Sequence, residues 1–522
     1  MTREGIPRTI IGTEDALSWY HRHMGDFLSQ KAALDAARIH FPDFLASRKK
    51  ALTLEAWLEG RQYDHSEELD ADDRAYGRAY SPDRNTTAEY ENLRSLSPSN
   101  FAGLVVKSVT QMCHIEGITR PGTEDSLPIW DTLRRNRWPS KQNSIHWEAV
   151  GIGLAYGVVY PGVDPITNAP MARMAGKSAT EMLAFYDDPD DEWSRFAIEA
   201  TKTTIVDERT KFKFSGWNVT LWDAKVMHHL EVTGDGLSEA DWKYLSYTEH
   251  DLPVPPVVQL GNRVSLSGKA TGEIEPILPI LRRIDQGLFD RLMMQRFGAW
   301  QVRYIAGLAK PDTPEAQAAQ SIKLRQEDLL VSTSPDTKFG TLAAASTQDQ
   351  VNVTDADLRM LSAIAQVPPH HLLGQSSNLQ AEALAAATEG LQRKAFEFRL
   401  NASEFHEQMA RLAAMVEDDM DTARAWDLRV RWRDESSGSM SQAADALGKL
   451  AQQLGVPLEM LWERIPGWTD DDVRRAKELV ESGSFEKLIQ QIVSEQNNPQ
   501  PDATQQSTGQ QGDGRPVDEA QQ

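Results

Sequence analysis

The feature that most constrains the fold is a long apolar stripe near residue 400. Between about residues 380 and 416, large apolar side chains recur every seven residues, at Leu384, Leu391, Phe398, Phe405 and Leu412. A seven-residue interval keeps these side chains on one narrow face of an α-helix. At ~1.5 Å per residue, such a helix is about 55 Å long. The chain must bury that face, either in its own core or against another subunit.

A second amphipathic helix precedes this one. Its apolar side chains fall at steps of four, three, four and four residues, at Ile277, Leu281, Ile284, Leu288 and Leu292. That spacing marks one face of a helix over residues 277–299. A shorter helix is predicted for residues 355–365, because Pro368 and Pro369 follow it and proline cannot continue the helical ladder. The spacing leaves open whether these faces pack within one chain or against a neighbouring copy.

Residues 157–260 have a different character. Short segments rich in β-branched and aromatic side chains alternate there with glycine, proline and aspartate. This pattern predicts an antiparallel, strand-rich module. A further strand is predicted where apolar and polar residues alternate, at 426–434.

The rest of the chain is predicted to be helix, loop or disordered tail. Apolar residues at helical spacing indicate helices over residues 14–60, with Pro42 as a break. The polar stretch 70–99 is predicted to be a loop. Further helices are expected at 100–112, 143–156 and 439–493. The glutamine-rich tail from residue 496 has almost no apolar side chain and is expected to be disordered.

Composition limits the class of protein. A chain of 522 residues is expected to form two to four structural units. Its 55 basic and 77 acidic residues give a net charge of −22, which excludes a protein whose whole surface binds nucleic acid electrostatically. The single cysteine, Cys113, cannot form an internal disulfide, and this fits a reducing compartment. We expect neither a secretory signal nor a membrane span, since the longest apolar stretch, 150–159, is about half of the ~20 residues required.

A search for catalytic and ligand-binding motifs gives little. There is no P-loop, and the glycines of residues 151–157 are interpreted as allowing close helix packing rather than as a dinucleotide fingerprint. The acidic run 187–192 is interpreted as a solvated turn between two strands. His228 and His229 point to opposite faces of a strand and cannot share one metal. We therefore predict no catalytic residues, no cofactor and no metal site, and hence no enzyme.

Three stretches carry a resemblance to a known family. Residues 143–160 lead from a helix through Tyr156 and Gly157 into a strand. Residues 272–307 lead through Glu273 and Pro276 into the amphipathic helix and end at Gly307. The third and most specific runs from Ile364 through Pro368-Pro369-His370-His371 to Gly374 and on to Leu384. Together they resemble the portal proteins of tailed double-stranded DNA bacteriophages, in the branch with a compact portal.

The resemblance implies an α+β, mainly α fold with wing, stem, clip and crown regions around a central channel. The implied regions are, in order, a wing (1–272), a stem helix (273–300), a clip (301–353), a second stem helix (354–366), a tunnel loop (367–379), a long inner helix (380–418), a wing return strand (419–436), crown helices (437–493) and a disordered tail (494–522).

The resemblance also implies the function and the partners. The chain would form a homo-oligomeric ring, a dodecamer, at the portal vertex of the virion capsid, after assembly in the host cytoplasm. Double-stranded DNA would pass through the ring during packaging and ejection. The implied partners are the packaging ATPase (the terminase large subunit), the major capsid and scaffold proteins and the head–tail adaptor, with no membrane.

Two groups of site residues follow from the resemblance. The loop nearest the DNA is expected to contain His370, His371, Gln375, Ser376, Ser377 and Asn378. The subunit interface is expected to use the two apolar stripes, Ile277 to Leu292 and Leu384 to Leu412. Arg393, Lys394 and Arg399 are weaker DNA-contact candidates, since the alternative is pairing with Glu389 or Glu397 on the helix surface.

Two other classes of protein remain open at this stage. One is another phage head component, such as a scaffold or minor capsid protein; scaffolds are typically helical, whereas residues 157–260 indicate strands. The other is a nuclease or hydrolase with an unrecognised site, for which Asp187 and Asp190 are the acidic candidates.

Overall fold

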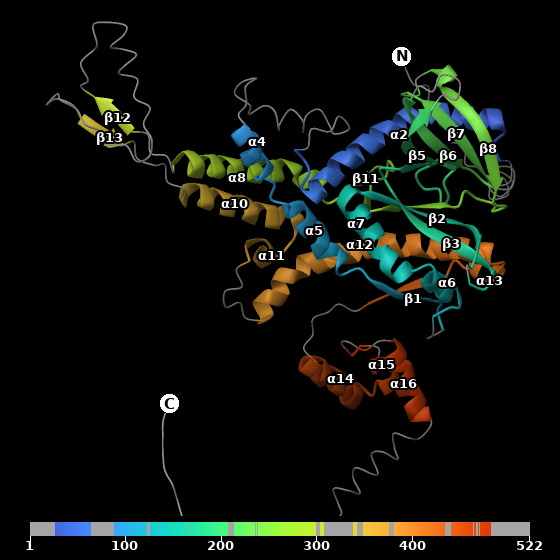
Figure 1. Cartoon of the computed structure of the whole chain (residues 1–522). Coiled ribbons are helices and arrows are strands. Elements are labelled where there is room, and N and C mark those ends of the chain that lie inside the picture. Colours follow the sequence, from blue (N-terminus) through green and yellow to red (C-terminus); the bar gives the residue numbers. More distant parts are fainter. Residues whose placement is uncertain are drawn as a thin grey trace, which may run out of the picture. The chain divides into compact units, whose positions relative to one another are not determined.

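The chain divides into two units, residues 1–433 and 434–522 (Figure 1). The computed structural model describes residues 27–63, 88–122, 126–164, 166–206, 213–234, 236, 238–298, 303–306, 338–341, 348–374, 381–433, 440–462, 464–465, 468 and 470–481. Helices and strands are mixed in the first unit, as the sequence predicts. Among the described residues, no helix has the length and hydropathy that crossing a bilayer requires.

A five-stranded antiparallel sheet forms one part of the first unit. Its strand order is β4-β5-β6-β7-β8, so each strand pairs with its neighbour in sequence. This confirms the predicted strand-rich module. The strands are β4 (Met182–Phe185), β5 (Phe196–Val206), β6 (Lys213–Trp222), β7 (Val226–Thr233) and β8 (Trp242–Glu249), with a short 3₁₀ turn, η1 (Glu239–Asp241), before β8.

Helix α2 (Gln30–Glu59) covers this sheet (Figure 1). Its Phe41 and Phe44 are at most 1% exposed, and the Phe41 ring meets those of Trp217 and Trp242 edge-on at 5.8 and 5.2 Å. The predicted break at Pro42 is wrong, because the helix continues through it. Proline removes one ladder hydrogen bond, but the two flanking phenylalanines anchor this turn in the core of the sheet.

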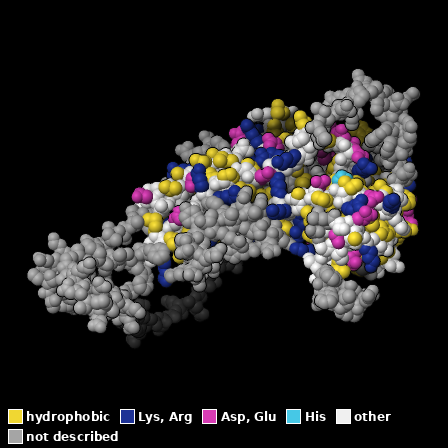
Figure 2. All heavy atoms as spheres, turned by 90° about the horizontal axis from the view of Figure 1, so that it is seen from above, with side chains coloured by type: hydrophobic (Ala, Val, Ile, Leu, Met, Phe, Trp, Pro, Cys, Tyr) yellow, Lys and Arg dark blue, Asp and Glu magenta, His cyan; other side chains and the backbone are white. Residues whose placement is uncertain are grey.

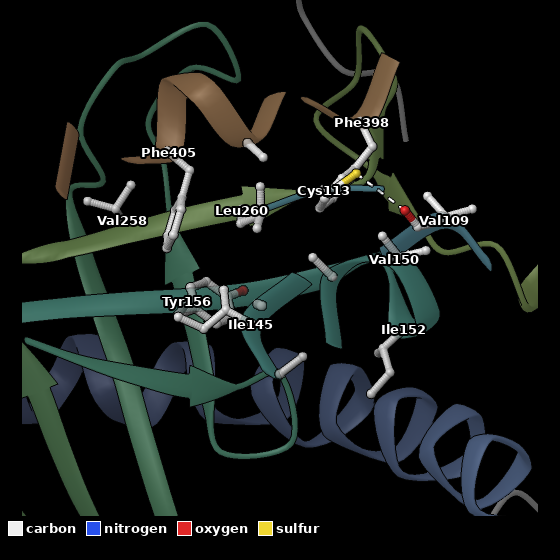
Figure 3. Close-up of a cluster of buried hydrophobic side chains, with 14 of the residues drawn as sticks. Val109, Cys113, Ile145, Val150, Ile152, Tyr156, Val258, Leu260, Phe398 and Phe405 are labelled. Carbon is white, nitrogen blue, oxygen red and sulfur yellow. Dashed lines mark hydrogen bonds between the residues drawn. The ribbon is translucent and has the colours of Figure 1, made fainter. Parts of the chain in front are cut away.

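A three-stranded sheet, in the order β3-β2-β9, lies against the long helix α12 (Ala381–Val416). Phe405 of α12 and Tyr156, Val258 and Leu260 of the strands belong to one buried cluster (Figure 3). A Cβ atom on Gly157 would lie 2.5 Å from Met409 Sδ and 2.8 Å from Phe405 Cζ. Glycine at this position therefore lets the helix approach the strand. The strands are β2 (Leu154–Val163), β3 (Pro170–Ser178) and β9 (Val257–Gly261), followed by the short pair β10 (Arg263–Val264) and β11 (Ala270–Thr271).

Short helices and one strand pair complete this core. Strand β1 pairs with β14, which confirms the strand predicted at 426–434. The loop predicted for residues 70–99 is wrong in part, because residues 88–95 are helical. The remaining elements are α4 (Ala88–Ser95), α5 (Phe101–Thr110), β1 (Ile115–Thr119), α6 (Ile129–Arg135), α7 (Trp138–Ile152), α13 (Met420–Ala423) and β14 (Arg429–Trp432).

Helices α8 (Leu278–Gly298) and α10 (Gln348–Ala365) run side by side (Figure 1). The contacts are antiparallel, since Arg283 pairs with Asp357 and Gly287 lies next to Thr354. The 3₁₀ turn η2 (Glu275–Ile277) precedes α8. Strands β12 (Arg303–Ala306) and β13 (Lys338–Thr341) form an antiparallel pair in the segment between α8 and α10.

The second unit consists of helices in its described part. They are α14 (Met440–Leu454), α15 (Leu458–Trp462) and α16 (Asp470–Glu481). This agrees with the helices predicted from residue 439, while the expected disordered tail lies outside the described residues.

A chain of buried polar groups crosses the core of the first unit. Trp138 Nε1 donates to His406 Nδ1 at 3.0 Å, the Nε2 atoms of His406 and His146 are 2.9 Å apart, and His146 Nδ1 is 2.9 Å from the Cys113 carbonyl oxygen. Because His406 Nδ1 accepts, its Nε2–H donates to His146, whose Nδ1–H donates to the carbonyl. Burial lowers the pKa of His146 to about 4. Both imidazoles are therefore neutral, and they link helices α7 and α12 by hydrogen bonds.

A half-buried carboxyl group joins α7 to the end of β3. Glu148 accepts a hydrogen bond from the Ser178 hydroxyl. Burial raises the pKa of Glu148 to about 7, and the nearby carboxylates of Glu55 and Glu181 add to the rise. The folded chain therefore holds a proton on Glu148 at pH values where the unfolded chain has lost it.

Replacing Glu148 by glutamine is expected to raise the free energy of unfolding at pH 8 by about 1–3 kcal/mol. The glutamate ionises near 4.5 when unfolded and near 7 when folded, so its contribution to stability is lost as the pH rises through this window. Urea unfolding at pH 5 and pH 8 measures the difference, which is expected to be much smaller at pH 5. Glu397→Gln, at an exposed site on α12, is the control. An equal gain at both pH values would contradict the assignment.

Candidate functional site

The segment predicted as a DNA-contacting loop begins as a helix. Residues Pro369–Leu373 form the single turn α11. Pro369 occupies its first turn, where proline needs no hydrogen-bond partner, and Gly374 ends it with a positive φ of 63°. The prediction of a loop throughout 367–379 is therefore wrong for 369–373. Proline and glycine, which indicate a loop, are also favoured at the start and just after the end of a short helix.

His370 and His371 lie on α11 with their rings edge to face, 4.5 Å apart. His371 is exposed and His370 is half-buried. Partial burial and the adjacent His370 lower the pKa of His371. Near neutral pH this ring therefore offers hydrogen bonds rather than charge. The other expected loop residues, Gln375, Ser376, Ser377 and Asn378, lie outside the described residues.

The apolar stripes expected at a subunit interface are largely internal. Seven of the ten side chains are at most 3% exposed in the single chain: Ile277, Leu281, Ile284, Leu391, Phe398, Phe405 and Leu412. The interface prediction is wrong for these seven, because the chain's own sheets and helices cover them. Leu288 and Leu292 are only partly buried. The side chain of Leu384 lies outside the described residues.

Lys394 of α12 joins three elements at the inner end of the α8–α10 pair. Its Nζ lies 2.5 Å from Glu273 Oε2 and 2.5 Å from the Ala365 carbonyl oxygen at the end of α10. The side chains of Lys394 and Glu273 are 10% and 5% exposed. Burial alone would raise the pKa of Glu273, but Lys394 and a hydrogen bond from Asn262 lower it overall. The carboxylate is therefore charged and paired.

A second buried carboxylate lies on α8. Asp285, fully buried, accepts hydrogen bonds from Gln62 Nε2 at 2.8 Å, the Tyr63 hydroxyl at 3.1 Å and the Ser99 backbone N–H at 3.0 Å. These hydrogen bonds lower the pKa of Asp285, but burial raises it by more, so it lies above the usual value. Asp285 thus ties α8 to the end of α2 and to the start of α5. In the sequence, the only signal for this site is that an acidic residue directly follows Ile284, which belongs to the apolar stripe.

The other cations considered as DNA contacts also have partners. Arg393 pairs with Glu389 one turn away on α12, as the alternative interpretation expected. Arg399 donates to the Met112 carbonyl oxygen, and its guanidinium lies over the Trp432 ring. On the face of the molecule in Figure 2, basic and acidic side chains are interspersed.

The acidic run 187–192 forms the turn between β4 and β5, as predicted. Asp187 pairs with Arg195 at 3.1 Å, Glu192 pairs with Arg411, and Asp188 and Asp191 accept hydrogen bonds within the turn. Within the described parts of the chain, no three His, Cys, Asp or Glu side chains are placed to hold a metal ion.

Comparison with known proteins identifies the family of this chain. The chain matches the family described as phage portal protein, SPP1 Gp6-like, over residues 42–499. The chain therefore belongs to the SPP1 Gp6-like family of phage portal proteins. No curated protein sequence matches the chain closely enough to count as a relative.

A solved structure also matches the chain. The chain is similar to a chain in the neck of a native GTA particle computed with C12 symmetry, at 11% identity and a TM-score of 0.36. The match covers 74% of this chain and 92% of that chain. The family assignment rests on the sequence match, which confirms the resemblance seen in the three stretches.

Replacing Lys394 by alanine is expected to lower the free energy of unfolding by about 3–5 kcal/mol, because Glu273 then remains buried without its cation. The adjacent Arg393 offers a matched control, since its 76% exposed side chain makes only a surface pair. Arg393→Ala is expected to cost less than about 0.5 kcal/mol. Urea unfolding of both variants measures the difference. Equal losses would show that the joint does not depend on the buried charge.

Proposed function

We propose that this chain is the subunit of a ring at one vertex of a phage-like capsid, the channel through which double-stranded DNA enters and leaves. The observation that carries the proposal is the family match over most of the chain. In this proposal the protein has a structural role and no catalytic one. Its location is the virion portal vertex, after assembly in the host cytoplasm.

The elements suit the regions that the family implies. The antiparallel α8–α10 pair corresponds to a stem, and the β12–β13 pair between these helices to a clip. Because α10 begins at Gln348, residues 348–353, which were assigned to the clip, belong to the stem in this proposal. The sheets and α2 form the wing, α12 the inner helix, and α14 to α16 the crown. We propose that the clip contacts the packaging ATPase and the head–tail adaptor, and the outer surface the capsid and scaffold proteins.

The net charge of −22 supports a channel rather than a DNA clamp. Each phosphate that a protein neutralises adds affinity through counterion release. A conduit must let DNA slide, so few fixed cations are expected along it. Charge screening over ~8 Å at physiological salt keeps acidic walls from closing the pore to DNA.

The purified protein is expected to form rings. Twelve copies of a 58.4 kDa chain make about 700 kDa. Native mass spectrometry gives the mass, and electron micrographs show whether a central opening is present. A monomer at micromolar concentration in every buffer tested would contradict the proposal.

Changing His370 and His371 together to alanine is expected to leave rings intact and to reduce DNA packaging or retention. Both residues lie on α11, outside the buried core, so folding does not depend on them. DNA content per particle is the measurement. Ile166→Ala, at a 92% exposed position between β2 and β3, is the control. Particles that fill and hold DNA normally would show that the histidines do not contact DNA.

A further inference from the structure

Three neighbouring cations of the first unit have no carboxylate within ion-pair distance among the described residues. They are Arg137 between α6 and α7, Lys141 on the first turn of α7, and Arg173 on β3. We call them the cationic cluster. Carboxylates are not scarce in a chain with 77 acidic and 55 basic residues, and other cations, such as Arg195 and Arg411, are paired. The missing partners are therefore a local property of this surface.

The edge of β3 holds the cluster together. The Asn136 side chain donates to the Ala172 carbonyl oxygen at 2.7 Å and accepts from the Met174 backbone N–H at 3.0 Å, so the α6–α7 turn lies along the strand. Lys141 Nζ donates to the Met174 carbonyl oxygen at 2.7 Å. Burial lowers the pKa of Lys141, and the charges of the two arginines of the cluster lower it further. The three cations therefore repel one another in the single chain.

The two arginines occupy defined places. Arg137 has a φ of 59°, in the left-handed region that Gly, Asn and Asp tolerate best. It also precedes α7 at the position where Ser, Thr, Asp or Asn usually caps a helix, and its side chain makes no capping hydrogen bond. The stem of Arg173 lies against Gly162 of β2, where an added Cβ atom would collide with Arg173 Cγ. The helix start therefore does not account for an arginine at 137, and Gly162 gives Arg173 room.

The surroundings of the cluster indicate which anion fits. The planar fork of an arginine matches the paired oxygens of a carboxylate or a phosphate. Carboxylates are present close by, because Asp131 of α6 pairs with Arg134 at 3.9 Å and Asp164, after β2, lies within electrostatic reach of Arg135. A DNA duplex extends far beyond three cations and would bring further phosphates against these carboxylates. A protein segment can place one or two carboxylates on the cluster alone.

We propose that the cationic cluster binds an acidic segment of a partner protein, whose carboxylates supply the ion pairs that the chain itself does not. The inference goes beyond the proposed function and does not rest on the ring, since all three cations belong to one chain. A bound carboxylate accepts charge-assisted hydrogen bonds from Arg137 and Arg173 and offsets the repulsion among the cations. The contact is expected to weaken as the salt concentration rises, because the site is partly exposed.

A labelled peptide of alternating Glu and Ser tests the site. Fluorescence anisotropy at low salt measures its binding to the purified full-length protein. Arg137→Asn and Arg173→Gln are each expected to weaken binding about tenfold. Arg134→Gln is the matched control, since it removes the same charge from the same region but its cation already pairs with Asp131. It is expected to change binding less than about twofold.

Stability and a second probe separate the possible outcomes. Asparagine tolerates a positive φ and caps helices, so Arg137→Asn is expected to fold at least as stably as wild type, which urea unfolding checks. Absence of peptide binding, or binding that neither Arg137→Asn nor Arg173→Gln weakens, would overturn the inference. A labelled DNA duplex of the same charge is expected to bind more weakly than the peptide. Tighter binding of the duplex, lost in the same two variants, would make this a DNA site and also overturn the inference. Native mass spectra of the same samples report on rings separately.

Discussion

The burial of helix α12 is the constraint on which the first unit depends. The helix contacts β2, β3 and β9, and also α5, α6 and β14. Leu391, Phe398, Phe405 and Leu412 are at most 3% exposed, and at ~1.5–3 kcal/mol each their burial contributes roughly 6–12 kcal/mol. Gly157 shows how closely helix and strand fit, since even one added carbon would collide with Met409 and Phe405.

Polar groups inside this core determine which elements meet. An apolar stripe alone tolerates sliding along a strand, whereas a buried charge or imidazole costs free energy unless its partner is in place. Lys394 requires Glu273 and the end of α10, Asp285 requires the end of α2 and the start of α5, and His406 requires Trp138 and His146. The contacts of Lys394 and Asp285 fix the base of the α8–α10 pair, and those of His406 fix α7 on α12.

The sequence predicted the helices and strands better than it predicted which of them pack together. Periodicity and Pro368 located α8, α10 and α12, and β-branched segments located the sheets, because these signals are local. The break at Pro42 failed since Phe41 and Phe44 hold that turn from the sheet. The spacing of the stripes left open what covers them, because periodicity reveals that a face is buried but not its partner, and the resemblance then assigned them to a subunit interface.

The proposed channel places opposite demands on one chain, since neighbours must bind tightly and DNA must bind weakly. Apolar helix faces can meet the first demand without adding charge. Weak binding of DNA is favoured because the cations of α12 already have partners within the chain. Arg393, Lys394 and Arg399 lie on the helix that follows the predicted DNA-contacting segment, yet each is engaged by a carboxylate or a carbonyl of its own chain. A cation engaged in this way releases few counterions from DNA, so α12 can stiffen the subunit and leave DNA free to move.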